Sequence, residues 1–361
     1  MAKQNAVVTG YGFYAPPRVV TNFDLERMGV ETSDEWVTTR TGIKERRFAG
    51  DGETTSTMAT KAARTALERA KLRPHDVDLI VLGTCSPDYL FPATACMVQT
   101  ALGAERAGAF DVEAACTSFV SALAIANGMI LAGTARNAVV IGAECLSRFL
   151  DLKDRTTCVL FGDGAGAVVL EASNASVGVE SAVLHADGSK GDLLWVEAGA
   201  TKLPATSETV AQGKHFIRMQ GGETFKLAVK SMADAAEEAL AEAGVTPDDI
   251  DLMIPHQANT RIIDAVVKRL RFPAEKVFVN IQRYGNTSAA SIPIAIAEAA
   301  EQGRLKKGDR VLLCAFGGGF TWGASVLEWW GVPIPDRREK PILERAARTV
   351  EDVLDKVRLP T

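Results

Sequence analysis

The sequence predicts a layered α/β protein built from two similar halves. Short β-rich runs alternate with helical stretches along most of the chain, which is typical of strands packed between helices. A second series of strands then follows the first, with matching segments in the same order. We therefore expect two copies of one strand–helix unit, packed as a pseudo-symmetric pair.

In the first half, the predicted strands are short β-rich runs, and the stretch TSTMATKAARTALERA predicts a helix over residues 55–70. These strands are expected at 5–12, 78–85, 109–115, 137–144 and 164–171. In the second half, a helix is expected over TRIIDAVVKRL at 260–270. The second series of strands is expected at 176–187, 251–259, 276–281, 309–317 and 322–330.

The repeat predicts how the chain is divided. Four segment pairs match in order: RPHDVDLIVLGTC with TPDDIDLMIPHQA, CTSFVSALAIA with NTSAASIPIAI, NAVVIGAE with DRVLLCAF, and GAVVLE with GASVLE. This matching places Cys116 and Asn286 at equivalent corners. We expect an N-terminal half over 1–172, a C-terminal half over 173–330, and an extension over 331–361 whose apolar residues recur at the spacing of an amphipathic helix.

Composition excludes several classes of function. The 361 residues are 47% hydrophobic with a net charge of −5, and no basic run is interleaved with aromatic residues. We therefore expect no nucleic-acid partner. Neither a signal-peptide pattern nor a membrane-spanning stretch is seen, so we expect no membrane association and a cytoplasmic location. None of the six cysteines forms a CxxC pair, and no metal site is expected.

Cys116 lies where a predicted strand, AFDVEAA, gives way to small and apolar residues with helical spacing. A cysteine at the N-terminus of a helix lies near unpaired N–H groups and the positive end of the helix dipole. We expect these to stabilise the thiolate and lower its pKa. Such a thiolate is a nucleophile suited to an acyl thioester. The other cysteines are expected to fill the core.

His256 and Asn286 are the candidate partners of Cys116. His256 follows the predicted strand DLMIP, and ligands of open α/β sheets bind beyond the carboxyl ends of strands. Asn286 follows Gly285, which permits an unusual backbone angle. Its side chain can cap a helix or donate to a developing oxyanion. We therefore expect all three side chains to meet in one pocket between the halves.

Three consecutive glycines follow a buried strand in FGGGFTWG, residues 316–323. This segment has neither the spacing nor the lysine of a phosphate-binding loop. It forms either a tight turn or a close approach of backbone N–H groups to a carbonyl oxygen. FGDGAGAVVL, from Phe161, also lacks the spacing of a dinucleotide-binding loop, and it is predicted to be a turn into a strand.

Long motifs resemble those of the β-ketoacyl-acyl-carrier-protein synthase III family, whose members are condensing enzymes with the thiolase fold. They are ACTSF, PHQANTRII, GNTSAASIP, FGDGAGAVVLE and FGGGFTWGA. The likeness runs from the N-terminus through SDEWVTTRTGIKERR to about Trp329. The resemblance implies a thiolase-like fold with α-β-α-β-α layers.

The resemblance also implies the reacting groups. Cys116 matches the acylated nucleophile, and His256 and Asn286 match the pair that supports decarboxylation. The backbone N–H groups of Cys116 and Gly318 match the oxyanion hole. The implied reaction is a decarboxylative Claisen condensation of an acyl-CoA primer with malonyl-acyl-carrier protein, which initiates fatty acid biosynthesis. Coenzyme A thioester is then a substrate, and no cofactor is expected.

Further positions match binding residues of the family. Trp36 and Arg155 match the pair that sandwiches the coenzyme A adenine. Phe91 matches a residue that reaches the partner subunit's acyl pocket, which implies a homodimer. The remaining matches line the pantetheine and phosphate path (Arg40, Gly221 and Asn259) or are candidates for docking the carrier protein (Lys226 and Arg261).

Several alternatives share the fold. Degradative thiolases use a second cysteine in CxGGG, whereas Cys314 stands one position too early and should face the other side of its strand. Elongating ketosynthases have a histidine where Asn286 stands. Hydroxymethylglutaryl-CoA synthases use a glutamate base, and Glu113 is three residues from the cysteine. A non-catalytic scaffold subunit would often lose the nucleophile. An acyl-loading or condensing enzyme of specialised, polyketide-type metabolism stays open, as does the primer.

Overall fold

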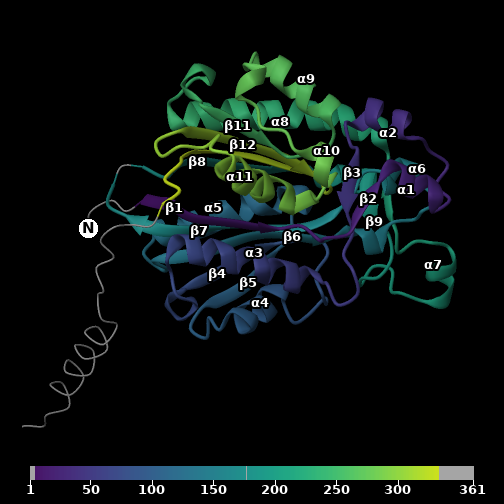
Figure 1. The fold of residues 1–361 in the computed structure, drawn as a ribbon, viewed down its shortest axis with the longest axis horizontal. Coiled ribbons are helices and arrows are strands. Elements are labelled where there is room, and N and C mark those ends of the chain that lie inside the picture. Colours follow the sequence, from purple (N-terminus) through teal and green to yellow (C-terminus); the bar gives the residue numbers. More distant parts are fainter. Residues whose placement is uncertain (1–4, 176, 333–361) are drawn as a thin grey trace, which may run out of the picture.

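Two sheets with corresponding strand orders form the framework of the molecule, of which the computed structural model describes residues 5–175 and 177–332 (Figure 1). The orders are β1-β7-β6-β4-β5 and β8-β13-β12-β11. In each sheet two antiparallel pairings are followed by a parallel one. The strands of the first sheet are β1 (Asn5–Tyr14), β4 (Leu79–Gly83), β5 (Gly108–Val112), β6 (Asn137–Cys145) and β7 (Asp163–Ser173). Those of the second are β8 (Val179–Ala186), β11 (Leu252–Pro255), β12 (Arg310–Gly317) and β13 (Thr321–Glu328).

Helices separate and cover the two sheets, giving five layers (Figure 1). The predicted layered α/β fold with two pseudo-symmetric halves is therefore confirmed. The outer helices are α3 (Thr55–Ala70) and α4 (Thr94–Leu102) below the first sheet, and α8 (Gly221–Ala243) and α9 (Thr260–Leu270) above the second. The central helices are α5 (Ser118–Leu131) and α11 (Ser291–Glu301).

The central helices are apolar on nearly all sides because each lies between two sheets. Phe119 and Leu123 of α5 and Ile292 and Ile296 of α11 belong to one core cluster that includes strands of both halves. The outer helices α3 and α9 have one buried face, and their bounds are the predicted ones. Burial on one or both sides therefore accounts for the two kinds of helical pattern in the sequence.

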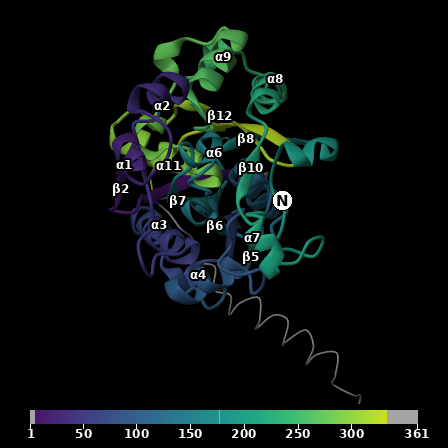
Figure 2. The ribbon, with the colours of Figure 1, turned by 90° about the vertical axis from the view of Figure 1, so that its right-hand side faces the viewer.

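Smaller elements gather at one end of the molecule, on the right in Figure 1, and Figure 2 looks onto that end. Two short sheets are formed there, by β2 (Val19–Thr21) with β3 (Glu45–Arg47) and by β9 (Leu194–Val196) with β10 (Ile217–Met219). The short helices are α1 (Asn22–Arg27), α2 (Asp34–Thr41), α6 (Arg155–Cys158), α7 (Ser207–Ala211) and α10 (Ile281–Tyr284).

The predicted strand at 276–281 does not form a ladder. The segment follows β11, but only an isolated bridge joins Met253 to Val277. The reason is a side chain that takes over the backbone pairing. Gln257 donates to the carbonyl of Phe278 at 3.2 Å and accepts from the N–H of Asn280 at 3.0 Å. A buried amide thus satisfies groups that a strand neighbour would otherwise pair.

The two halves meet in two equivalent 3-10 turns, η2 (Ala115–Thr117) and η7 (Ser288–Ala290). Their first residues, Ala115 and Ser288, both have a φ of 47°, in the left-handed region that costs energy for residues other than glycine. This equivalence pairs Cys116 with Ala289 and Asn286 with Glu113. The expected pairing of Cys116 with Asn286 is therefore wrong by three residues. Small residues that repeat with helical spacing resemble each other in more than one register, so sequence likeness did not fix the alignment.

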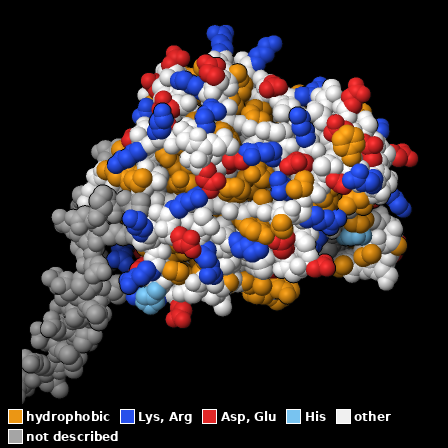
Figure 3. All heavy atoms as spheres, viewed as in Figure 1, with side chains coloured by type: hydrophobic (Ala, Val, Ile, Leu, Met, Phe, Trp, Pro, Cys, Tyr) orange, Lys and Arg blue, Asp and Glu red, His pale blue; other side chains and the backbone are white. Residues whose placement is uncertain are grey.

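The predicted boundary between 172 and 173 falls at the last residues of β7, and we propose that the halves divide after this strand. The predicted amphipathic helix at 331–361 lies outside the described residues, apart from 331 and 332. Among the described helices, none combines the length and hydropathy needed to cross a membrane. The face seen in Figure 3 carries acidic and basic side chains interspersed with each other.

Each turn is packed against a strand of the opposite half at a glycine. A Cβ on Gly142 of β6 would lie 2.2 Å from the carbonyl oxygen of Ala289. A Cβ on Gly317 of β12 would lie 2.6 Å from the backbone nitrogen of Cys116. Both distances are shorter than any real contact of a methyl group, so the two halves can approach this closely only because side chains are absent.

We expect Gly142→Ala to lower the free energy of unfolding by about 2 kcal/mol or more, because the methyl group would force the halves apart. Equilibrium unfolding in urea measures this. Gly222→Ala, in α8 with nothing within 4 Å of its Cβ, is the control. It should leave stability unchanged or raise it by up to about 1 kcal/mol. Equal effects of the two changes would contradict the packing described here.

Candidate active site

Cys116 lies in η2, between β5 and α5, with 6% of its surface exposed. The strained turn is held by Ser118, whose hydroxyl accepts from the N–H of Ala114 at 2.8 Å and donates to the carbonyl of Ala115 at 2.7 Å. Thr321 of β13 also donates to the carbonyl of Ala114, at 2.8 Å. Residues of both halves therefore fix the backbone that carries the sulfur.

The expectation of a lowered pKa at Cys116 is wrong. Burial raises the pKa of Cys116 to about 12, although the hydroxyl of Ser288 acts to lower it. Desolvation of a fully buried thiolate shifts a pKa by several units. A helix terminus contributes about 0.3–1 kcal/mol, which is less than one unit. Burial therefore dominates, and the thiol is protonated near pH 7.

Asn286 lies directly before η7, and its amide is oriented by the turn. Its Oδ1 accepts from the N–H of Ser288 at 2.8 Å. Its backbone is held on both sides, because its N–H donates to Leu160 at 2.8 Å and its carbonyl accepts from Gly162 at 2.9 Å. The side chain thus caps the turn through its oxygen and leaves its nitrogen for another partner. The capping role is thus observed, and the donor role stays a prediction.

His256 follows the last residue of β11 and is fully buried. Its Nδ1 lies 2.6 Å from the hydroxyl of Ser291, the first residue of α11. Its Nε2 is buried and has no hydrogen-bond partner among the described residues. Burial lowers the pKa of His256 to about 3, so the ring is neutral near pH 7. A neutral imidazole with one free nitrogen is suited to bind a substrate oxygen.

The second turn links these three residues. The hydroxyl of Ser288 acts to lower the pKa of Cys116, η2 packs on η7, and the N–H of Ser288 donates to Asn286. Ser291, three residues along the chain, binds His256. The structure therefore groups the thiol, the amide and the imidazole around η7. Ser288 and Ser291 were not singled out from the sequence, because only the packing of η2 on η7 reveals their roles.

The glycine segment after β12 approaches the nucleophile with its backbone. Gly317 lies against the nitrogen of Cys116, and a Cβ on Gly318 would lie 2.6 Å from the carbonyl oxygen of Leu194. Neither position has room for a side chain. The assignment of the Gly318 N–H to an oxyanion hole stays a prediction.

Glu144 is a buried carboxylate that sequence reasoning missed. It lies in β6 and accepts hydrogen bonds from the hydroxyl groups of Thr84 and Ser86, at 3.2 and 2.5 Å. It also accepts from the N–H of Ala289 in the opposite half, at 3.4 Å. Burial raises the pKa of Glu144. Nothing in its sequence context distinguishes it from an exposed glutamate at the end of a strand.

Trp36, Arg40 and Arg155 come together at the end of the molecule seen in Figure 2. The guanidinium carbons of Arg40 and Arg155 each lie 5.0 Å from the centre of the Trp36 ring. Trp36 and Arg40 lie on α2, and Arg155 is the first residue of α6. The structure thus groups an aromatic ring with two cations, which can stack on a base and bind phosphates.

The other predicted binding residues lie on neighbouring helix ends. Asn259 caps α9 by accepting from the N–H of Arg261 at 2.9 Å, and α9 packs on α2. Lys226, in the first turns of α8, pairs with Glu223 at 3.0 Å and is exposed. Gly221 begins α8. Phe91 is 86% exposed in a loop on the first half, away from this group. All of these roles stay predictions.

Two alternative chemistries find no support at their expected positions. Cys314 packs in the outer core cluster with α8 and α9, whereas its neighbour Ala315 belongs to the central cluster. The carboxylate of Glu113 accepts from the N–H of Ala115 at 2.9 Å and is exposed. Among residues 5–175 and 177–332, no three or more histidine, cysteine or acidic side chains are grouped to hold a metal ion.

Comparison with known proteins places the chain in a family. Models of 3-oxoacyl-[acyl-carrier-protein] synthase III match residues 110–188, and models of its C-terminal part match residues 240–329. The curated β-ketoacyl-[acyl-carrier-protein] synthase III of Roseiflexus sp. (strain RS-1) is 56% identical over 90% of this chain and 98% of its own length. The chain belongs to the β-ketoacyl-[acyl-carrier-protein] synthase III family.

Solved structures agree with this assignment to the synthase III family. The 3-oxoacyl-[acyl-carrier-protein] synthase III of Aquifex aeolicus VF5 is 51% identical, with a TM-score of 0.83, covering 90% of this chain and all of its own. A priming β-ketosynthase from the R1128 polyketide pathway is 34% identical, with a TM-score of 0.85, covering 92% and 98%. The resemblance and the thiolase-like fold predicted from the sequence are confirmed.

We expect the buried His256 of this synthase to make stability depend on pH. Its pKa is about 3 in the folded protein and near 6.5 when unfolded. The unfolded chain therefore binds a proton that the folded chain does not, and stability falls as pH drops below about 6.5. Replacing His256 by Gln should remove about 2 kcal/mol of the stability lost between pH 7 and pH 5.

Urea unfolding at the two pH values measures this difference. The exposed His75, replaced by Gln, is the matched control and should leave the pH dependence as in the parent protein. The same pH dependence in His256→Gln and in the parent protein would show that the ring is not buried as a neutral base.

Proposed function

We propose that the chain condenses an acyl-CoA primer with malonyl-acyl-carrier protein, with loss of CO2, through an acyl thioester on Cys116. The observation that carries this proposal is the grouping of Cys116, His256 and Asn286 around η7 in a chain of the synthase III family. The product is a 3-oxoacyl-carrier protein, and the reaction initiates fatty acid synthesis.

In the first half-reaction the sulfur of Cys116 attacks the thioester carbonyl of acyl-CoA. The S–acyl bond to Cys116 forms as the bond to coenzyme A breaks, and the cysteine proton ends on the coenzyme A sulfur. The N–H groups of Cys116 and Gly318 stabilise the tetrahedral oxyanion. Because burial raises the pKa of Cys116, the proton leaves during attack and not from a resting thiolate.

In the second half-reaction His256 and Asn286 bind the thioester oxygen of malonyl-carrier protein. Loss of CO2 leaves negative charge on this oxygen, and the two donors stabilise it. The resulting carbanion attacks the acyl group on Cys116, the S–acyl bond breaks, and the cysteine sulfur recovers a proton. Removing one donor of this kind typically lowers a rate by about 10²–10³.

Ser291 sets the proton position that this role requires. A neutral imidazole donates from Nε2 only when Nδ1 accepts. The hydroxyl of Ser291 lies 2.6 Å from Nδ1, while its oxygen is 3.4 Å from the N–H of Gln257. The Ser291 hydroxyl therefore accepts a hydrogen bond from the N–H of Gln257 and donates one, through its own proton, to Nδ1 of His256. It leaves Nε2 protonated and free to donate.

The coenzyme A thioester is bound as a substrate, and no metal or redox cofactor takes part. Trp36 and Arg155 hold the adenine, and Arg40, Gly221 and Asn259 line the pantetheine and phosphate path. Lys226 and Arg261, at the beginnings of α8 and α9, dock the acidic carrier protein. The support for these roles is the cluster around Trp36 and the packing of α2 against α9.

The working unit is a homodimer that buries the loop containing Phe91. Tyr89, Leu90 and Phe91 are 59%, 75% and 86% exposed, which forms an apolar projection. The neighbouring strand β5 is an edge of its sheet and has unpaired backbone groups. A second copy covers both features, and Phe91 then reaches the acyl pocket of the partner subunit.

An acyl-loading or condensing enzyme of polyketide-type metabolism is the second candidate, favoured by the 34% identity with the R1128 priming enzyme. The two functions differ in primer and carrier protein, not in the reacting groups. A panel of acyl-CoA primers assayed with malonyl-carrier protein, the product read by mass, separates them. A preference for acetyl or branched short-chain primers favours fatty acid initiation.

We expect Cys116→Ser to abolish transfer of a radiolabelled acyl group from acyl-CoA to the protein, because the hydroxyl is a far weaker nucleophile. We expect His256→Ala to retain this transfer but to lower condensation with malonyl-carrier protein by about 10²-fold or more. Gel-based labelling and product mass measure the two steps separately.

Cys85→Ser is a matched control for the nucleophile, since its sulfur lies 3.7 Å from the same Ser288 hydroxyl. Labelling that persists in Cys116→Ser and disappears in Cys85→Ser would refute the assignment. Equal loss of both steps in His256→Ala would show that the imidazole instead activates the cysteine.

We expect Phe91→Asp combined with Leu90→Asp to shift the protein from dimer to monomer, because two charges would be buried in the interface. Sedimentation velocity at micromolar concentration measures the change. Phe23→Asp, which alters a 56% exposed ring on α1, is the control and should remain dimeric. A parent protein that sediments as a monomer contradicts the proposal.

A further inference from the structure

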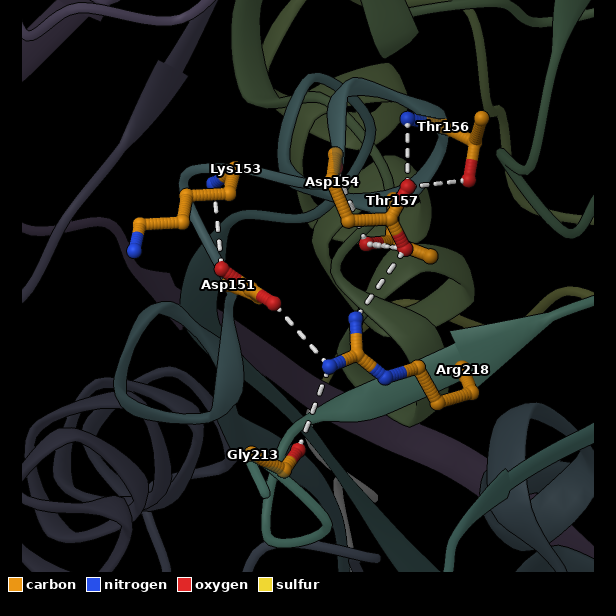
Figure 4. Close-up of polar contacts among 7 residues, drawn as sticks. All are labelled: Asp151, Lys153, Asp154, Thr156, Thr157, Gly213 and Arg218. Atoms are coloured by element: carbon orange, nitrogen blue, oxygen red, sulfur yellow. Dashed lines mark hydrogen bonds and ion pairs between the residues drawn. The ribbon is translucent and has the colours of Figure 1, made fainter. Parts of the chain in front are cut away.

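Arg218 lies between two loops that are distant in the sequence (Figure 4). Its Nη2 donates to Asp151 at 3.0 Å and to the carbonyl of Gly213 at 3.2 Å. Its Nη1 lies 3.5 Å from Asp154. One guanidinium thus joins two carboxylates of the segment before α6 to the loop after α7, which is the bidentate use for which arginine is suited.

Asp154 is also the N-cap residue of α6. Its Oδ1 accepts from the N–H of Thr156 at 3.0 Å, and its Oδ2 accepts from the hydroxyl of Thr157 at 3.1 Å. Arg155 follows directly, and it donates to the carbonyl of Glu31 at 3.0 Å and lies over the ring of Trp36. Whatever fixes Asp154 therefore fixes the backbone from which Arg155 reaches Trp36.

The strand that carries Arg218 is anchored on its other face. Ile217 and Met219 of β10 belong to the apolar cluster that also contains Phe161 and Trp36. Side chains alternate along a strand, so Arg218 points away from this cluster and toward the loop. The contacts of Arg218 with Asp151, Asp154 and Gly213 are called the Arg218 clamp below. This clamp links the loop that carries Arg155 to the same apolar cluster against which Trp36 packs.

The charges on the loop favour the clamped arrangement. Although burial acts to raise it, the N–H of Lys153 and the guanidinium of Arg218 hold the pKa of Asp151 below its ordinary value. Both carboxylates are mostly covered, with side-chain exposures of 18% and 22%, whereas Arg218 is 37% exposed. Without the guanidinium, two carboxylates close together would repel each other in partly desolvated positions.

We propose that Arg218 is a positioning residue that sets the affinity of the site for the nucleotide part of coenzyme A, by holding the Asp151–Asp154 loop so that Arg155 faces Trp36. This inference rests on the proposed function, in which Trp36 and Arg155 hold the adenine. It extends that function to a residue that touches neither substrate nor reacting atoms. Malonyl-carrier protein has no nucleotide, so its binding does not depend on this clamp.

The test compares the two substrates in Arg218→Gln. We expect the KM for acetyl-CoA and the Kd of free coenzyme A, measured by calorimetry, to rise by about threefold to tenfold. The KM for malonyl-carrier protein and the kcat should stay within about twofold of the parent values. Arg218→Lys should recover part of the lost affinity for coenzyme A, because lysine retains the positive charge but lacks the planar guanidinium with its two terminal nitrogens.

Arg310→Gln is the matched control, because Arg310 forms a similar two-bonded pair with Glu180, at 2.9 and 3.0 Å, at the start of β12. Arg310→Gln should change neither the KM for acetyl-CoA nor the Kd of free coenzyme A. Asp151→Asn should weaken coenzyme A binding, and combining it with Arg218→Gln should add little.

Unchanged coenzyme A binding in Arg218→Gln would overturn the inference, as would equal rises in the KM values of both substrates. The Kd of free coenzyme A needs no catalysis. A parent protein that makes no condensation product therefore refutes the proposed function, while the binding comparison still decides the role of Arg218.

Discussion

The site depends on a contact between backbones that leaves no room for side chains. Gly142 of β6 and Gly317 of β12 belong to strands of opposite halves, and each lies closer to the turn of the other half than a methyl group permits. This crossed packing brings η2 and η7 together. The thiol, the amide and the imidazole are then grouped around η7, although Cys116 and Asn286 come from segments on opposite sides of the interface. The chemistry follows from how the halves are joined, not from either half alone.

Much of the fold could be predicted from the sequence because its patterns are local. The bounds of α3 and α9 were predicted to the residue, since each helix has one apolar face and clear ends. The strand at 276–281 was wrong because a single buried side chain, Gln257, competes for the backbone pairing. The equivalence of Cys116 and Asn286 was wrong by three residues. Both errors depend on contacts between segments that no local pattern reveals.

The candidate site was predictable where motifs are long and not where function depends on packing. Cys116, His256 and Asn286 each stand in a distinctive motif. Ser288, Ser291, Glu144 and Arg218 look like ordinary polar residues until the halves are assembled. The expected lowering of the cysteine pKa failed for a quantitative reason. A helix terminus shifts a pKa by less than one unit, whereas full burial shifts it by several units. The sequence indicates that a helix follows Cys116, but it does not indicate how deeply the thiol is buried.

The pseudo-symmetry also shows how the two turns differ in what faces their backbone N–H groups. In the pseudo-symmetric arrangement, the backbone N–H of Ala289 is equivalent to the backbone N–H of Cys116. Glu144 is likewise equivalent to Gly317. In one half a glycine lies against this N–H without room for a side chain, and in the other the carboxyl group of Glu144 accepts a hydrogen bond from it. Two turns of the same backbone geometry therefore present their N–H groups to different surroundings, and the buried carboxyl group of Glu144 occupies the hydrogen-bonding position in only one of them.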